Sequence, residues 1–564
     1  MADLPAPARL DRTTAAALDT SIPDANLSQA QLSRRRLLRS AGVIGRVAGG
    51  AAVPFEPVVV SGPGRNRPLR DSAVRHWLAG DHHVHTVFSP DGVHTVLDQA
   101  RHAHDNGLGW MVVTDHGGPT HVRIGAELTA PEVRTARRAL PELLVFQGLE
   151  WQIPAAEHGT VIVTPGPGDV DLLTEFERDF DANVTGSTAW TRANEALAVA
   201  GVRWLGAQVD AGRIHDALFL ANHPSRQGLD TPHELRNWRD ADPRVAIGFE
   251  GAPGHQAAGI TAPDGPGESR GYYGRDRGTD PNQYQAYPQE SYRTWGGFDW
   301  MTATVGGLWD SLLAEGKPWS ITANSDSHDI YLHPARRREA LTKADFDRDG
   351  RYPPPEYRAG LNTKAGDYWP GHYSRTHVGS GTRSYRGVAR GLRDGRVWVD
   401  HGHLVAHLDV RVRRAGAPPG RGVTIGGTLA PPRGSRVEVT VRATLQDRAN
   451  GAGFVPSLNR VDLIRGAVRG GPAAERDRFT APDTRVIRSW DTSGSRGTLT
   501  LVHAVDDVDE PFYVRLRGTD GNIGQPGLLG PSIDPSGPRM DPAGAADPWL
   551  DLWLYSNPIW VVPS

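Results

Sequence analysis

The sequence predicts an α/β fold with a barrel-like parallel sheet, followed by a separate antiparallel β-sandwich. Between about residues 70 and 405, short apolar runs alternate with helical patterns, which is typical of parallel strands joined by helices. After residue 405, apolar and polar residues alternate one by one between turn residues, which favours antiparallel strands with one buried face. The length of 564 residues is sufficient for two or three domains.

Residues 1–52 are expected to be an export signal and to lie outside the folded domains. Arg34, Arg35 and Arg36 precede a run of small and apolar residues, as in a twin-arginine signal. That run is too short and too rich in glycine to span a membrane. This interpretation predicts export through the twin-arginine machinery and an extracellular location; a disordered basic tail is the alternative.

Six apolar runs in the first region end in polar or histidine-bearing tips. They lie at residues 110–117, 143–151, 159–166, 217–225, 245–251 and 318–328. Their β-branched and aromatic content indicates buried strands, and helical patterns at 94–107 and 130–142 lie between some of them. Because catalytic groups in parallel barrels gather at the carboxyl ends of the strands, we expect these tips to share one site.

The same patterns give the domain boundaries. We place the barrel at residues 70–405, with insertions at 252–300 and 330–378, and the β-sandwich at residues 406–564. The first insertion is rich in Gly, Pro, Tyr and charged residues and follows a predicted strand end. It is therefore a candidate substrate lid.

The composition limits both the partners and the kind of metal site. With 62 basic and 65 acidic residues, the net charge of −3 gives no indication of a nucleic-acid or anionic-membrane surface. The chain has no cysteine, so disulfides and thiolate ligands are excluded. Any metal must be held by nitrogen and oxygen donors, and the 22 histidines are the main source of nitrogen.

Histidines and carboxylates that can bind metal follow successive predicted strands. His83 and His85 are two residues apart, as are Asp326 and His328, so in an extended segment each pair faces one side. The nine candidate donors are His83, His85, Asp91, His116, Glu150, His158, His223, Asp326 and His328. Since one ion takes four to six ligands, nine donors predict two or three divalent metals with a bridging carboxylate. Zinc, manganese and iron suit these donors equally.

The motifs DHHVHT, SPDG, TDHG, GLEW, ANHP and SDSH, in this order across residues 81–328, resemble the polymerase and histidinol phosphatase (PHP) family. The resemblance implies a distorted (β/α)7 barrel with a two- or three-metal centre. It also implies how the ligands are divided among the ions. For a first ion they are His83, His85, Glu150 and Asp326; for a second, Glu150 again with His158 and His223; for a third, Asp91, His116 and His328.

The family resemblance further implies a hydrolase of phosphate esters that uses a metal-bridged hydroxide, with Glu150 and Asp326 catalytic through the ions that they hold. Arg226 is a candidate for binding phosphate oxygens, and a surface salt bridge is its alternative role. Glu250 is a candidate for positioning substrate or water, and a structural carboxylate is the alternative. The expected partner is a small-molecule phosphate ester and not a nucleic acid, because strand binding requires a basic groove.

Two other functions remain open at this point. Some PHP relatives cleave carboxylic or carbamate esters, and the same nucleophile can attack a carbonyl carbon. A metal-binding module without catalysis is the other alternative, although the presence of all nine donors argues against it.

A possible structural calcium site lies in the second insertion. Asp345, Asp347 and Asp349, followed by a glycine and then Glu356, have the spacing of an EF-hand loop. Three prolines at 353–355 block the usual exit helix. An acidic turn without calcium is the alternative.

Overall fold

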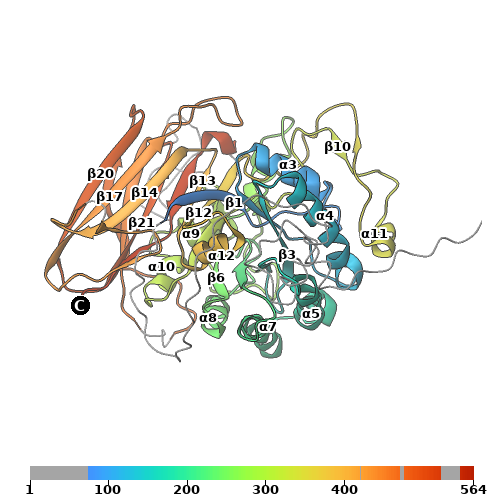
Figure 1. The fold of residues 1–564 in the computed structure, drawn as a ribbon, viewed down its shortest axis with the longest axis horizontal. Helices are drawn as coiled ribbons and strands as arrows, with labels where there is room; N and C mark the ends of the chain where they lie inside the picture. Colours follow the sequence, from blue (N-terminus) through green and yellow to red (C-terminus); the bar gives the residue numbers. More distant parts are fainter. Residues whose placement is uncertain (1–73, 419–420, 471–474, 522–546) are drawn as a thin grey trace, which may run out of the picture.

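The computed structural model describes residues 74–418, 421–470, 475–521 and 547–564 (Figure 1). An α/β part, with helices packed around a mixed sheet, lies beside a part built mostly from antiparallel strands (Figure 1). The expected export signal at residues 1–52 lies outside the described residues.

The central sheet of the α/β part has the strand order β13-β12-β1-β2-β3-β4-β5-β6-β9. These strands are β1 (His76–Asp81), β2 (Trp110–Val113), β3 (Leu144–Gln152), β4 (His158–Val163), β5 (Ala217–Ala221), β6 (Ala246–Ala252), β9 (Ser320–Ala323), β12 (Ser374–Ser380) and β13 (Val397–His401). The pairs β1–β2, β2–β3, β5–β6 and β6–β9 are parallel. The predicted parallel sheet is therefore present, in two groups of three strands.

Strand β4 differs from the prediction, because it runs antiparallel to both of its neighbours, β3 and β5. Only residues 153–157 connect β3 to β4, and a connection of this length makes a hairpin, whereas a parallel crossover requires a dozen residues or more. The reversal has a functional consequence. His158, the first residue of β4, lies at the same end of the sheet as the carboxyl ends of the parallel strands.

Closure of the sheet into a barrel is not confirmed. Among the described residues, β9 forms a ladder with β6 and none with β1. An isolated parallel bridge joins Val84 to Ser327, in the segments that follow β1 and β9. In addition, the Thr376 hydroxyl of β12 donates to the Ala323 carbonyl at 2.8 Å and accepts from the Ala323 N–H at 2.9 Å. The two ends of the sheet thus approach each other beside the predicted donors.

Helices cover the outside of this sheet (Figure 1). They are α3 (Val96–Asp105), α4 (Ala126–Ala139), α5 (Asp169–Phe180), α6 (Ala182–Thr185), α7 (Arg192–Asp210), α8 (Pro232–Ala241), α9 (Trp300–Ala303), α10 (Leu308–Leu313) and α12 (Tyr385–Arg393). The helices predicted at 94–107 and 130–142 are confirmed as α3 and α4. Thr95 begins α3 through a capping box with Asp98. No helix in the described part of the chain combines the length and the apolar character that crossing a bilayer requires.

The antiparallel part consists of two layers. One layer has the order β15-β14-β17-β20, formed by β14 (Val405–Arg414), β15 (Val423–Thr424), β17 (Ser435–Leu445) and β20 (Thr498–Val508). The other contains β16 (Thr428–Leu429), β18 (Arg460–Ala467), β19 (Arg485–Asp491), β21 (Phe512–Thr519), β22 (Trp553–Ser556) and β23 (Ile559–Val561). Alternate residues such as Val437, Val439 and Val441 are fully buried in the core of this part, which explains the period-two pattern.

The sequence did not predict that the second layer continues the central sheet. Strand β22 pairs antiparallel with β13, so that Val399 lies opposite Tyr555. A buried ion pair adds to this connection: Arg515 of β21 donates to both carboxylate oxygens of Asp310 in α10, at 2.9 and 2.7 Å. The two parts of the chain are therefore joined by main-chain and side-chain contacts.

The first insertion packs into the α/β part. It contains β7 (Thr294–Trp295), β8 (Phe298–Asp299) and three short 3₁₀ turns, Gln256–Gly259, Arg270–Tyr272 and Gln289–Tyr292. Tyr287, Tyr292 and Trp295 are buried in the same apolar core as the central strands. The second insertion carries β10 (Ala335–Arg336), α11 (Lys343–Asp349) and β11 (Glu356–Tyr357).

Candidate metal centre

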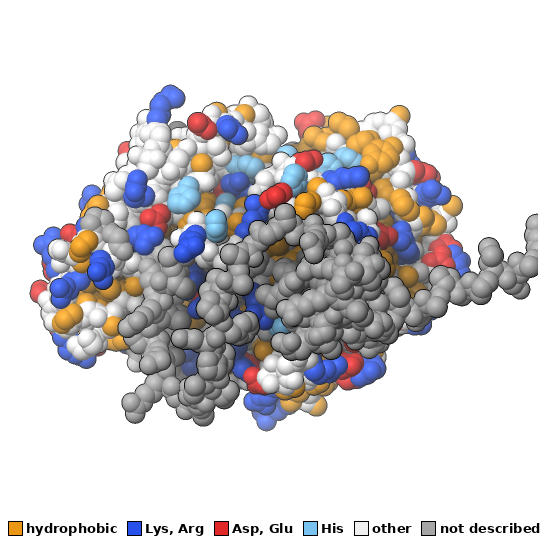
Figure 2. Space-filling view, in the orientation of Figure 1, with side chains coloured by type: hydrophobic (Ala, Val, Ile, Leu, Met, Phe, Trp, Pro, Cys, Tyr) orange, Lys and Arg blue, Asp and Glu red, His pale blue; other side chains and the backbone are white. Residues whose placement is uncertain are grey.

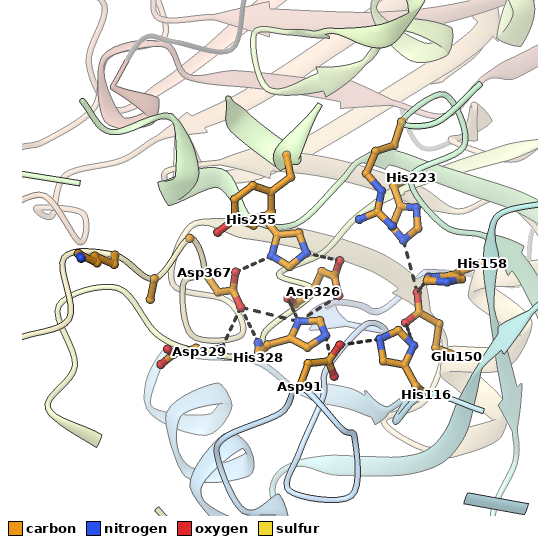
Figure 3. Close-up of a pocket in the computed structure, with 15 residues that line it drawn as sticks. Asp91, His116, Glu150, His158, His223, His255, Asp326, His328, Asp329 and Asp367 are labelled. Atoms are coloured by element: carbon orange, nitrogen blue, oxygen red, sulfur yellow. Dashed lines mark hydrogen bonds and ion pairs between the residues drawn. The ribbon is translucent and has the colours of Figure 1, made fainter. Parts of the chain in front are cut away.

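All nine predicted donors lie together at the end of the central sheet, around the buried carboxylate of Glu150 in β3 (Figure 3). Five imidazole nitrogens lie within 3.4 Å of its oxygens, those of His83, His85, His116, His158 and His223. Glu150 Oε1 is 3.0 Å from His83 Nε2, and Oε2 is 2.9 Å from His116 Nδ1. One carboxylate therefore contacts five histidines from four separate segments.

The alternation of side chains after β1 explains how two of these histidines reach the centre. His83 and His85 both face Glu150, whereas His82 points away and contacts Thr160 and Thr322 through its ring nitrogens at 3.2 and 2.8 Å. This agrees with the i, i+2 spacing.

Asp326 is the second carboxylate of the centre. Its Oδ1 is 3.1 Å from His83 Nε2 and 3.2 Å from His85 Nε2. Together with Glu150 these residues form a group whose donor atoms all lie within 4.8 Å of one another. This is the ligand set that the resemblance implies for the first ion.

The remaining donors lie beside this group. Asp91 contacts His116 Nε2 at 3.1 Å and His328 Nε2 at 3.5 Å, and the His328 ring stacks on His85 with centroids 3.8 Å apart. His158 Nδ1 is 3.1 Å from Glu150 Oε1. The donors expected for the third ion therefore lie together, with His85 as an additional member. The set expected for the second ion differs, because the donor atoms of Glu150 and His158 group with His116 rather than with His223, whose Nε2 is 3.4 Å from Glu150 Oε1.

The donors fit divalent metal ions. His85 Nε2, Glu150 Oε2 and Asp326 Oδ1 are buried and have no hydrogen-bond partner among the described residues, although His85 Nε2 lies 3.2 Å from each of the two oxygens. The opposite nitrogen of His83 is 2.8 Å from Glu250 Oε1, and that of His85 is 2.8 Å from the Ser89 hydroxyl. Metal-binding histidines typically have such a partner on the second nitrogen.

The electrostatics keep the carboxylates ionised. Burial opposes the charge of Glu150, but His83 and His158 outweigh it and hold its pKa well below the usual value. Burial likewise opposes the charge of Asp326, and His83 and His255 hold its pKa well below the usual value. Both groups are therefore anionic at neutral pH and suited to bind cations.

A cavity of about 380 Å³ opens onto the centre and is lined by seven of the nine donors together with Arg226, Tyr272 and Lys364. Arg226 Nε lies 3.4 Å from Glu157 Oε1. Glu250 is fully buried and does not line this cavity. It contacts His83 and accepts the His223 main-chain N–H at 2.9 Å, which favours the structural alternative.

Two residues near the donors were missed by sequence reasoning. His255 Nε2 is 2.8 Å from Asp326 Oδ2, and His255 Nδ1 is 2.5 Å from Asp367 Oδ1. Both residues lie in the insertions, outside the motifs and the predicted strands. One feature of the sequence could have indicated His255: it follows the end of β6 by three residues, as other donors follow their strands.

The structure does not bring the carboxylates of the possible calcium site together, which favours the alternative without calcium. Asp345, Asp347 and Asp349 lie on helix α11, which starts with a Thr342 capping box and ends at Gly350 in a left-handed conformation. Each of these carboxylates, and Glu356 as well, forms an ion pair with a nearby basic side chain. The partners are Arg348 for Asp345 and Asp349, Lys343 for Asp347, and Arg358 for Glu356. The capping signals favour a helix, and on this helix the carboxylates do not converge on a common ion position.

Comparisons with known proteins leave the function to be argued from the site. No protein-family model matches the chain. No curated protein matches it. Among solved structures, it is similar to a two-domain protein from Bacteroides vulgatus described as containing a predicted PHP-like metal-dependent phosphoesterase. The two chains are 14% identical, the match covers 81% of this chain and 95% of the other, and the TM-score is 0.30. A TM-score of this size carries no argument about this chain.

Proposed function

We propose that this protein is a metal-dependent hydrolase of phosphate esters that holds two or three divalent ions around Glu150. The observation that carries the proposal is the contact of one buried, ionised carboxylate with five imidazoles. A single ion cannot use all of these donors together with Asp91, Asp326 and His328, so a shared carboxylate between ions is the simplest arrangement.

Each part of the site has a role in such a reaction. Bound divalent ions would supply Lewis acidity, lowering the pKa of water and neutralising charge on phosphoryl oxygens. Glu150 and Asp326 are anionic donors that would balance the charge of the ions. Glu250 fixes the orientation of His83 and of the His223 main chain. The cavity above them admits substrate.

The cations of the cavity favour a phosphate ester as substrate. Arg226 and Lys364 both line the cavity. Of these, Arg226 is in contact with Glu157, from which its guanidinium can turn to bind two phosphate oxygens. The visible part of the face in Figure 2 intersperses basic and acidic side chains. Together with the cavity size, this favours a small molecule over a nucleic-acid strand.

The test compares three nitrophenyl esters on the full chain, stripped with chelator and then reloaded with zinc, manganese or iron(II). We expect hydrolysis of nitrophenyl phosphate or bis-nitrophenyl phosphate that requires added metal and is lost in Glu150→Gln. Glu339→Gln, at an exposed carboxylate paired with Arg358, is the matched control and should remain active. Hydrolysis of nitrophenyl acetate alone would indicate a carboxylic or carbamate esterase. Metal binding with no turnover of any ester would indicate a binding module.

We also propose that residues 1–52 direct export through the twin-arginine machinery. The support is the sequence pattern around Arg34 and Arg35 alone. Changing both arginines to lysine should keep the protein in the cytoplasmic fraction of an expressing cell, and export that is unchanged by the double substitution would contradict the proposal.

A further inference from the structure

His255 and Asp367 form a pair that joins the two insertions to the candidate metal centre (Figure 3). The His255 ring lies between two carboxylates, with Nε2 2.8 Å from Asp326 Oδ2 and Nδ1 2.5 Å from Asp367 Oδ1. Both ring nitrogens of His255 therefore face carboxylate oxygens. Asp326 Oδ1 is left to face His83 and His85.

Asp367 also fixes the main chain that carries the next donor. Its Oδ2 accepts the N–H of His328 at 2.6 Å and that of Asp329 at 3.0 Å. His328 Nδ1 in turn contacts the Asp326 carbonyl at 2.8 Å, which leaves His328 Nε2 directed toward Asp91. One carboxylate outside the nine donors thus holds the segment from Asp326 to Asp329.

The main chain at His255 and at Asp326 has an uncommon conformation, which neighbouring contacts must stabilise. His255 and Asp326 are both in the left-handed region, with φ of +53° and +46°, where non-glycine residues stay only when the surroundings hold them. The segment also packs tightly. A Cβ on Gly254 would lie 2.2 Å from Asp326 Cβ, so only glycine allows this approach.

We propose that His255 and Asp367 are positioning residues that hold Asp326 and His328 in the geometry for binding metal. The inference rests on the proposed metal centre and extends it beyond the nine donors. His255 acts through Asp326, which its Nε2 contacts at 2.8 Å. The donor atoms of His255, Asp326 and His328 also lie within 4.8 Å of one another, so direct ligation by His255 is the alternative that the ion count at saturation tests. Loss of such outer partners typically weakens metal affinity by about 10- to 100-fold.

The experiment is a calorimetric titration of the full-length, metal-free protein with manganese or zinc. The variants are His255→Asn, whose residue type tolerates positive φ, and Asp367→Asn, which keeps one oxygen that accepts main-chain N–H groups. His104→Asn, at an exposed position of α3, is the matched control. We expect both variants to bind about 10- to 100-fold more weakly than the wild type, with the same number of ions at saturation. The double variant should bind little more weakly than either single variant, because the two residues act through one contact.

Three results would overturn the inference. The first is a metal affinity of His255→Asn and Asp367→Asn that equals that of the wild type and of His104→Asn. Another is one ion fewer at saturation, which would make His255 a ligand. The third is a wild-type protein that binds no ion, which would also overturn the proposed function, whereas the first two leave that function intact. Circular dichroism checks the fold of each variant, and if His255→Asn does not fold, Asp367→Asn decides by the same criteria.

Discussion

Replacing His94 by phenylalanine should make the protein less sensitive to mild acid. His94 is 1% exposed, its ring lies 4.4 Å from that of Trp369 between centroids, and its Nε2 has no hydrogen-bond partner among the described residues. Burial, followed by the nearby charges of His333, His102 and Arg336, lowers the pKa of His94 from 6.5 to about 3. The folded protein therefore keeps this imidazole neutral in mild acid.

The size and sign of the effect follow from linkage. In the unfolded chain His94 has an ordinary pKa near 6.5, so protonation stabilises the unfolded state as the pH falls below that value. The contribution of neutral His94 to stability is fully present above pH 6.5 and is lost progressively toward pH 3. Between pH 7.5 and pH 5 the free energy of unfolding should fall by about 2 kcal/mol through this group.

The assay is urea unfolding of wild type and His94→Phe at pH 7.5 and pH 5. The fall in unfolding free energy between the two pH values should be smaller in the variant by about 2 kcal/mol. Any cost of packing the larger ring is the same at both pH values and cancels. His104→Phe, at an exposed position of the nearby helix α3, should behave as wild type. The reasoning is refuted if His94→Phe loses as much stability at pH 5 as wild type does.

Three further substitutions test other parts of the structure. Arg515→Met should lower the free energy of unfolding by about 3–5 kcal/mol in chemical denaturation, because it leaves Asp310 buried without its partner; a change below 1 kcal/mol would contradict this. Arg226→Ala should reduce kcat/KM for a phosphate ester by about 10- to 100-fold, mainly through KM, and should leave metal content unchanged. Gly248→Ala should disturb the pairing of β6 with β9, because its Cβ would lie 2.1 Å from a main-chain oxygen. Gly109→Ala, with its nearest neighbour at 3.5 Å, should melt close to wild type.

The donors could be predicted because most of them lie in or after a buried strand near its carboxyl end. His83, Glu150, His223 and Asp326 come from segments whose apolar runs fix the strands, and strand ends of a parallel sheet meet at one edge. His158 was predicted on weaker grounds. It reaches the same edge only because β4 is reversed by a hairpin, and the length of residues 153–157 was the signal for that reversal.

The parts that sequence reasoning missed depend on long-range contacts. His255 and Asp367 lie 112 positions apart in irregular segments and meet only once both insertions pack on the sheet. Likewise, the pairing of β22 with β13 joins strands far apart in the chain, which no local pattern records. The possible calcium site depended on the spacing of carboxylates alone, whereas the capping signals at Thr342 and Gly350 favour a helix there.

The most direct test of the metal centre is an anomalous scattering map from crystals of the full chain grown with manganese. The account predicts two or three peaks within about 2–2.5 Å of donor atoms. At least one peak should be shared by Glu150 and His83 Nε2, and it should be absent in crystals of Glu150→Gln. A map without peaks at these donors, or one in which manganese binds only elsewhere on the protein, would contradict the central claim.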